Sequence, residues 1–249
     1  MAKPKVITFA NQKGGVAKTT SAVSTGHHLA KEGKEVLIVD FDPQGQCFTA
    51  LGGNAENCVF NMLIQQSDPC QWVRKTGRES LHIIPGNRTT ATAQIVMSAE
   101  NRPITAVQDV LKPLYKEYDY IIFDTAPSVG GLQERAVWAS DLVVLPTATE
   151  YLSSDGLMQM MTTLNGLAEK GWKGKLAGIL PTFYDTQTKQ SQTAIAQLQE
   201  YFPDSVLTPI HRATILRECA AEGMTIFEKS PKSRAAKEYA ALANYLTTL

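Results

Sequence analysis

The stretch Lys13-Gly14-Gly15-Val16-Ala17-Lys18-Thr19-Thr20 decides the fold of this chain. It follows an apolar run at residues 6–10 and precedes a helical pattern at 19–31. An apolar strand, a glycine-containing turn and a helix N-terminus together form a cradle for phosphate groups. The stretch carries two lysines, although a single lysine suffices to hold the phosphates of a nucleotide. The additional lysine, Lys13, therefore needs another role.

Length and composition favour a folded α/β protein with a sizeable core. The chain has 249 residues, of which 43% are hydrophobic and 19% charged, and its formal net charge is zero. These values exclude a largely disordered chain and a uniformly charged surface. No C-x-x-C spacing occurs among the cysteines, which argues against a zinc or iron–sulfur site; they are Cys47, Cys58, Cys70 and Cys219. We expect these thiols to be reduced, as in a cytoplasmic protein. No apolar run reaches the roughly 18 residues that a membrane-spanning helix needs.

Apolar runs bounded by turn residues alternate with helical patterns along the chain. The runs predict strands at 6–10, 36–39, 81–84, 120–123, 142–145 and 176–180. The helical patterns lie at 19–31, 104–118, 153–170, 191–201 and 232–248. Continuous apolar runs suit strands covered on both faces, and their alternation with helices predicts parallel strands joined by crossovers. We therefore expect a doubly wound α/β fold, a mostly parallel sheet flanked by helices, in a single domain over residues 1–249.

The glycine-containing stretch departs from the standard P-loop pattern G-x-x-x-x-G-K-[ST] at two positions. Gln12 and Ala17 stand where that pattern has its glycines. The backbone N–H groups of residues 14–19 can still point at phosphates, Lys18 can neutralise the β- and γ-phosphates, and the Thr19 hydroxyl can ligate Mg²⁺. A methyl group is small, so we expect the loop to keep its shape provided that φ at Ala17 is not strongly positive.

Three aspartates follow two further predicted strands. Asp40 and Asp42 come at the end of the strand predicted at 36–39, just before Pro43, and Asp124 follows the strand predicted at 120–123. Carboxylates at the C-terminal ends of parallel strands converge on the crevice where open α/β sheets bind ligands. Asp124 is therefore a candidate Mg²⁺ ligand, directly or through water. If the strand breaks at Pro43, Asp42 turns towards the γ-phosphate.

Together, these segments resemble the ParA/MinD family of ATPases, which carry a deviant Walker A motif. Residues 11–20 resemble that motif, most closely in its short Soj-like form, residues 40–45 the second acidic motif, and residues 124–128 the Walker B motif. Further matches lie at 139–141, 150–157 and 230–234, so the resemblance covers nearly the whole chain and is weakest at 54–78. Two departures are Ala17, where the family has glycine, and Ala126, where many relatives have proline.

The resemblance implies an ATPase that forms a homodimer around ATP. In this family a lysine at the position of Lys13 crosses the dimer interface and contacts the phosphates of the other subunit. The residue at the position of Asp42 positions the attacking water, so Lys13, Lys18 and Asp42 are the implied catalytic residues. The implied nucleotide-binding residues are Gly14, Gly15, Val16, Ala17, Lys18, Thr19, Thr20 and Pro209, with Pro181 as an alternative beside adenine. The implied metal ligands are Thr19, Asp40 and Asp124.

A local excess of positive charge lies near the C-terminal end. Residues 207–237 hold six basic and three acidic side chains, a net charge of +3. Such an excess is ordinary for a solvated surface. However, Arg212, Lys232 and Arg234 match positions at which Soj-like proteins contact DNA. The resemblance therefore implies non-specific binding to DNA phosphates and association with the nucleoid.

Other functions remain open at this point. A ParB-like or cargo-adaptor partner is implied, and the cargo is a plasmid, a chromosome or a protein complex. One alternative is a MinD-like ATPase on a membrane, but no Lys or Arg follows Lys237 in the last helical pattern, so we expect no membrane attachment. Another alternative is an ATP-dependent metabolic enzyme of the same fold, in which Lys13 has no role.

Overall fold

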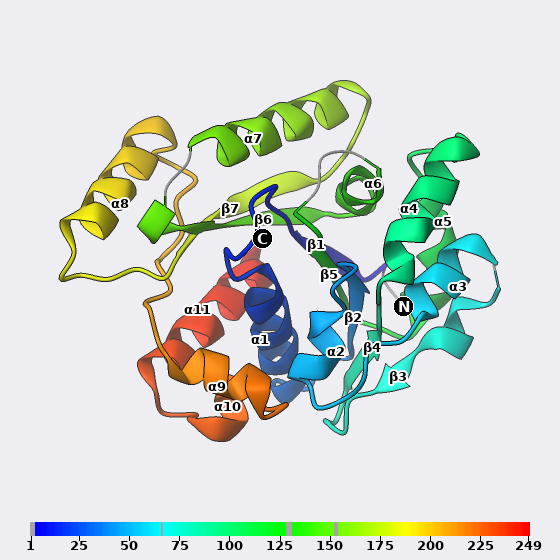
Figure 1. Cartoon of the computed structure of the whole chain (residues 1–249), viewed down its shortest axis with the longest axis horizontal. Helices are drawn as coiled ribbons and strands as arrows, with labels where there is room; N and C mark the ends of the chain where they lie inside the picture. Colours follow the sequence, from blue (N-terminus) through cyan, green and yellow to red (C-terminus); the bar gives the residue numbers. More distant parts are fainter. Residues whose placement is uncertain (1–2, 66, 128–130, 152–153) are drawn as a thin grey trace.

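The computed structural model describes residues 3–65, 67–127, 131–151 and 154–249 (Figure 1). Within these residues, seven strands form one sheet in the order β3-β4-β2-β5-β1-β6-β7. The parallel strands are β1 (Lys5–Phe9), β2 (Val36–Phe41), β4 (Leu81–Ile84), β5 (Tyr120–Thr125), β6 (Leu142–Ala148) and β7 (Lys175–Thr182). The short strand β3 (Arg74–Lys75) pairs antiparallel with β4 at one edge. The predicted doubly wound, mostly parallel sheet is thus confirmed, with β3 as the unpredicted addition.

The strands form where the apolar runs predict them because both faces of the sheet are covered. Every described residue of β2, β5 and β6 is buried, so these strands need no polar face. Alternate residues enter different cores: Ile38 packs on the side of α1, whereas Leu37 and Val39 pack on the opposite side. The observed strand ends lie within three residues of the predicted ones, and β4 matches its prediction at both ends.

The helices lie on both sides of the sheet (Figure 1). One group comprises α1 (Lys18–Lys31), α2 (Gln46–Ala50), α9 (Ile215–Ala221), α10 (Ile226–Lys229) and α11 (Arg234–Thr248). The opposite group comprises α3 (Cys58–Ile64), α4 (Thr89–Ala99), α5 (Ala106–Leu111) and α6 (Leu132–Trp138). A third core lies beneath α7 (Ser154–Glu169) and α8 (Lys189–Tyr201). The 3₁₀ segments are Pro69–Trp72, Lys112–Lys116 and Thr149–Tyr151.

Two helix predictions need correction. The single helix predicted over 104–118 is wrong, because α5 ends at Leu111 and a 3₁₀ segment follows that contains Pro113. Proline lacks the N–H that an α-helix interior requires, so the regular helix stops before it. The helix predicted from 232 begins instead at Arg234, since the hydroxyl of Ser233 accepts a hydrogen bond from the N–H of Ala236 and caps the helix. Ser153, the predicted first residue of α7, lies outside the described residues.

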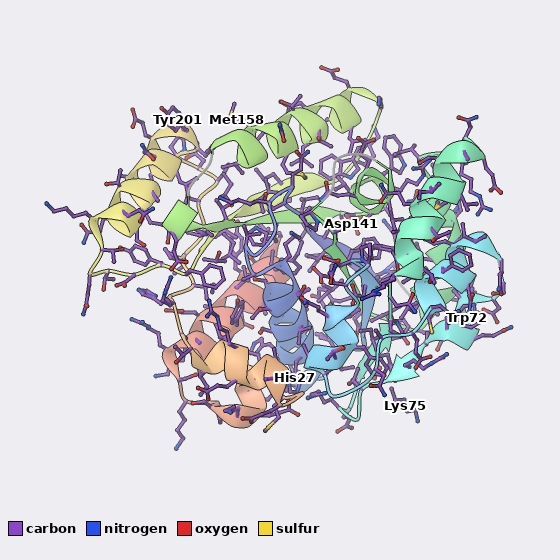
Figure 2. The ribbon with its side chains drawn as sticks, viewed as in Figure 1. His27, Trp72, Lys75, Asp141, Met158 and Tyr201 are labelled. Carbon is purple, nitrogen blue, oxygen red and sulfur yellow. The ribbon has the colours of Figure 1, made fainter. Side chains whose placement is uncertain are left out.

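Helix α11 is anchored against α1 by its apolar side. Tyr239 and Leu246 are fully buried, and the Tyr239 hydroxyl lies 3.4 Å from that of Ser21 on α1. His27 of α1, labelled in Figure 2, bonds through Nδ1 to the hydroxyl of Thr225 at 2.6 Å. These contacts fix α10 and α11 relative to the helix that follows the glycine-containing loop.

Arg78 ties the loop before β4 to the segment around α10. Its guanidinium donates to the carbonyls of Leu51 (2.8 Å) and Gly223 (2.9 Å), and its Nη2 lies 2.7 Å from the carboxylate of Glu228. The Arg78 side chain is only 10% exposed. A planar guanidinium carries five N–H donors in a fixed fork, so one side chain serves all three partners at once.

Candidate functional site

The loop between β1 and α1 is held by the strands beside it. Asn11 donates from Nδ2 to the carbonyl of Pro146 in β6 at 2.7 Å, and its Oδ1 accepts the N–H of Lys13 at 2.9 Å. On the other side, the hydroxyl of Thr182 in β7 donates to the carbonyl of Val16 at 3.2 Å. The loop is therefore pre-formed, and its polar anchors include Asn11, which the sequence analysis did not single out.

Ala17 adopts a left-handed backbone conformation. Its φ is 66° and its ψ is 31°, and Gly15 in the same loop has a φ of 70°. The condition set from the sequence, that φ at Ala17 is not strongly positive, is therefore not met. An L-residue pays roughly 1–2 kcal/mol in this region, because its Cβ approaches the following carbonyl oxygen. Positive φ at this position explains why the standard pattern has glycine here.

Lys18 begins α1 and points back along the loop. Its ammonium donates to the carbonyl of Lys13 at 2.9 Å, and the residue is only 6% exposed. Burial lowers the pKa of Lys18, and the carboxylates of Asp124 and Asp42 oppose this shift. A buried cation that faces two carboxylates and the loop carbonyls is suited to hold an anionic phosphate group.

Asp40 and Asp124 are neighbours across the ladder of β2 and β5. The two residues are register partners, and both are fully buried. Asp40 accepts the N–H of Asp42 through Oδ1 and the N–H of Cys47 through Oδ2, each at 3.0 Å. Burial raises the pKa of Asp40, and the nearby Asp124 raises it further. Burial likewise raises the pKa of Asp124 to about 6, although hydrogen bonds from Thr19 and Cys47 oppose the shift.

Thr19 and Asp124 provide oxygen ligands that fit Mg²⁺. The Thr19 hydroxyl donates to Oδ2 of Asp124 at 2.6 Å. Among the described residues, Oδ1 of Asp124 is buried without a hydrogen-bond partner. A buried carboxylate oxygen with unused lone pairs, next to a hydroxyl, matches the hard oxygen donors that Mg²⁺ prefers. Of the predicted metal ligands, Thr19 and Asp124 are in contact and Asp40 lies beside them.

Asp42 leaves the strand and borders a cavity of about 580 Å³. Strand β2 ends at Phe41, and Oδ1 of Asp42 accepts the N–H of Gln44 at 2.8 Å in the turn that follows. Of the possibilities left open by the sequence, the structure shows the one in which the strand ends before Pro43. The predicted loop residues that line this cavity are Gly14, Gly15, Val16, Ala17, Lys18, Thr19 and Thr20. Phe183 and Arg217 line it as well, and neither was predicted.

A smaller cavity of about 200 Å³ adjoins the loop at Ala17 and Thr20. Phe183, Ile210 and Arg212 are among its other lining residues. The segment that carries them runs beside β7, because Ile210 donates its N–H to the carbonyl of Pro181 at 2.8 Å. Pro209 does not line either cavity, so its neighbour Ile210 is the better candidate for contact with a nucleotide base.

The three predicted DNA-binding residues lie on or near the segment around α11. Lys232 is exposed before the helix, and Arg234 is the first residue of the helix. Nε of Arg234 lies 3.7 Å from Glu238, which also bonds to Nδ1 of His211 at 2.6 Å. Arg212 forms an ion pair with Glu150 and remains half exposed. Glu238 thus places the His211–Arg212 segment beside Arg234.

Comparison with known proteins identifies the family. A family model described as an AAA domain matches residues 4–177. The sporulation initiation inhibitor protein Soj of Bacillus subtilis is 37% identical over 96% of both chains. The chromosome-partitioning ATPase Soj of Thermus thermophilus is 35% identical, over 97% of this chain and 95% of that protein. This chain belongs to the ParA/MinD family of ATPases. The predicted family resemblance is therefore confirmed.

Two solved structures share the fold of this chain. The ATP complex of Cyanothece McdA matches with a TM-score of 0.89 at 22% identity, over 99% of this chain and 98% of that one. Cobyrinic acid a,c-diamide synthase of Mycobacterium smegmatis, with a bound ATP analogue and magnesium, has a TM-score of 0.84 at 29% identity. It matches over 98% of this chain and 94% of that chain. The likeness to McdA shows the fold alone.

Two further points concern the Walker B segment and the length of the helices. Ser128 of the Walker B segment lies outside the described residues. Among the described helices, none combines the length and apolar character that crossing a bilayer requires.

Proposed function

We propose that this chain is a ParA-like ATPase that binds Mg-ATP, dimerises around it and hydrolyses it. The arrangement of Lys18, Thr19 and Asp124 around one pre-formed loop supports this most directly. ATP is the substrate, and its phosphates would lie in the cavity that Gly14, Gly15 and Asp42 border. The backbone N–H groups of the loop and the start of α1 favour negative charge there.

The side chains divide the work of hydrolysis between them. Lys18 would leave the carbonyl of Lys13 and neutralise the terminal phosphates, which costs little since its present partner is a neutral carbonyl. Thr19 and Asp124 would hold Mg²⁺, which neutralises charge on the phosphates when bound. Asp42, on the cavity wall, would position the attacking water. Lys13 would reach the phosphates of the second subunit and stabilise the charge that develops there.

The decisive experiment replaces Asp42. Asp42→Ala should leave ATP binding intact while turnover falls about 100-fold or more, measured as phosphate release and by titration with a fluorescent ATP analogue. Asp68→Ala is a matched control, because Oδ1 of Asp68 accepts the N–H of Cys70 at 3.0 Å as Asp42 accepts that of Gln44. The control removes the same local hydrogen bond but should hydrolyse ATP normally. An Asp42→Ala variant that hydrolyses ATP at the parent rate would refute the role.

We further propose that the ATP-bound dimer binds DNA without sequence preference and positions a cargo, under stimulation by a partner protein, in the cytoplasm at the nucleoid. Exposed Lys232 and Arg234, together with Arg212, support this. Retention on arbitrary DNA should require ATP and weaken with salt. Arg234→Glu should abolish it, whereas Lys173→Glu, an exposed charge reversal on another surface, should not. Retention that ignores ATP, or that survives Arg234→Glu, would count against DNA binding.

Two other functions are weaker candidates. A membrane role would need a free amphipathic helix, but the apolar residues of α11, including Tyr239, Leu242 and Leu246, are buried in the core. The 29% identity to cobyrinic acid a,c-diamide synthase favours an ATP-dependent metabolic enzyme as the second candidate. Turnover that requires an added small-molecule acceptor, and that is indifferent to Lys13→Ala, would favour the enzyme.

A further inference from the structure

Cys47 lies beside Asp40 and Asp124, two of the proposed magnesium ligands. Neither the family resemblance nor the proposed hydrolysis gives Cys47 a role. Its thiol donates to Oδ2 of Asp124 at 3.3 Å, and its backbone N–H donates to Asp40. One ligand atom from each of Asp40, Cys47 and Asp124 lies within 4.8 Å of the other two, and all three residues are fully buried. The three residues form the Asp–Cys–Asp cluster.

One carboxylate oxygen of the Asp–Cys–Asp cluster is available as a metal ligand. Among the described residues, Oδ1 of Asp124 lacks a hydrogen-bond partner although it is buried. In tetrahedral zinc sites, Zn–S is about 2.3 Å and Zn–O about 2.0 Å, which places sulfur and oxygen ligands about 3.5 Å apart. The observed separation of 3.3 Å between Sγ of Cys47 and Oδ2 of Asp124 is close to that spacing. Zinc sites with three protein ligands keep a fourth position open for water or another ligand.

The ligand set selects against magnesium. Mg²⁺ and Ca²⁺ take oxygen ligands, whereas a thiolate favours Zn²⁺, Co²⁺ and other softer divalent cations. Thr19, whose hydroxyl bonds to Asp124, also lines the cavity beside the loop.

We propose that Asp40, Cys47 and Asp124 bind a thiophilic divalent cation such as Zn²⁺ in the nucleotide-free protein. The thiol loses its proton to solvent as the cation binds. On the proposed function, Asp124 also serves Mg²⁺, so the two cations exclude each other. Zinc would then hold the protein in a form that cannot accept Mg-ATP.

Cobalt spectroscopy of the nucleotide-free protein tests the site without any assay of turnover. Co²⁺ should give a thiolate-to-cobalt charge-transfer band that Zn²⁺ abolishes. Cys47→Ala should lose the band and bind Zn²⁺ at least about tenfold more weakly. Cys219→Ala is the matched control, because it removes another buried thiol and should keep the band. A band that is absent from the parent, or that survives in Cys47→Ala, would overturn the proposal.

A measurement on the parent protein is independent of how the variants fold, and a second one tests whether the two cations exclude each other. X-ray absorption of the zinc-loaded parent should show a sulfur neighbour at about 2.3 Å, and a shell of nitrogen and oxygen alone would overturn the site. Zn²⁺ should also weaken binding of a fluorescent ATP analogue with Mg²⁺ in the parent but not in Cys47→Ala. If the parent binds no nucleotide but gives the cobalt band, the proposed function fails and the metal site stands.

Discussion

Replacing Ala17 with glycine should stabilise the protein, although the same change normally destabilises one. With φ at 66°, Ala17 occupies a region that costs an alanine roughly 1–2 kcal/mol and a glycine almost nothing. Glycine also adds conformational freedom to the unfolded chain, which reduces this gain in stability by about 0.4–1 kcal/mol. The difference leaves a net gain on the order of 0.5–1 kcal/mol. For a chain of this length, that raises the Tm by about 1–4 °C.

A matched variant separates backbone strain from loss of the methyl group. Ala241 is exposed in the interior of α11, so Ala241→Gly should cost about 0.5–1 kcal/mol. Thermal melts and urea midpoints of the two variants, without nucleotide, should therefore shift in opposite directions. If Ala17→Gly melts at or below the temperature of the parent while Ala241→Gly is destabilised, the backbone strain assigned to Ala17 is refuted.

Three further perturbations follow from the contacts described. Lys13→Ala should stay monomeric with ATP in light scattering while one subunit still binds the nucleotide; an ATP-dependent dimer would contradict its bridging role. Burial lowers the pKa of His27 to about 4 from 6.5, so the unfolded chain takes up the proton first, and stability present above about pH 6.5 is lost as the pH falls towards 4. His27→Gln should flatten this slope in urea titrations, and an unchanged slope would exclude His27 as its source. Arg78→Ala should lower the free energy of unfolding by about 2–3 kcal/mol. Arg74→Ala, which breaks a more exposed pair with Glu56, should cost less than about 1 kcal/mol in the same urea titration, and equal losses would contradict the ranking.

The central sheet was predictable from sequence because burial on both faces leaves a local signal. Strands β1, β2, β4, β5, β6 and β7 all coincide with continuous apolar runs. The short elements are below the length that periodicity can detect: β3 has two residues and pairs with β4, which follows it in the chain, and α10 has four residues and is capped by Thr225 and Glu228. The prediction of one helix over 104–118 was wrong because Pro113 interrupts a segment with helical periodicity.

The candidate site was predictable in its residues but not in its conformations. The motif spacing located Lys18, Thr19 and Asp124, which the structure brings together. An alanine gives no sign of positive φ by itself; the only hint at position 17 is the glycine of the standard pattern, and the pinned loop imposes the strain. Cys47 was missed since its contact with Asp124 spans 77 residues of sequence. Its position at the start of α2, seven residues after Asp40, is the signal that would have found it.

The pairing of Asp40 with Asp124 has a consequence for how this chain can be altered. Because the two residues are register partners, the distance between their backbones follows from the strand spacing, about 4.8 Å, and not from any loop. An insertion after Phe41 or after Thr125 would change what surrounds the two carboxylates without moving them apart. A slip of one residue between β2 and β5 would instead turn one carboxylate to the opposite face of the sheet. The loops that follow β2 and β5 can therefore be replaced while the sheet keeps the spacing of the two carboxylates.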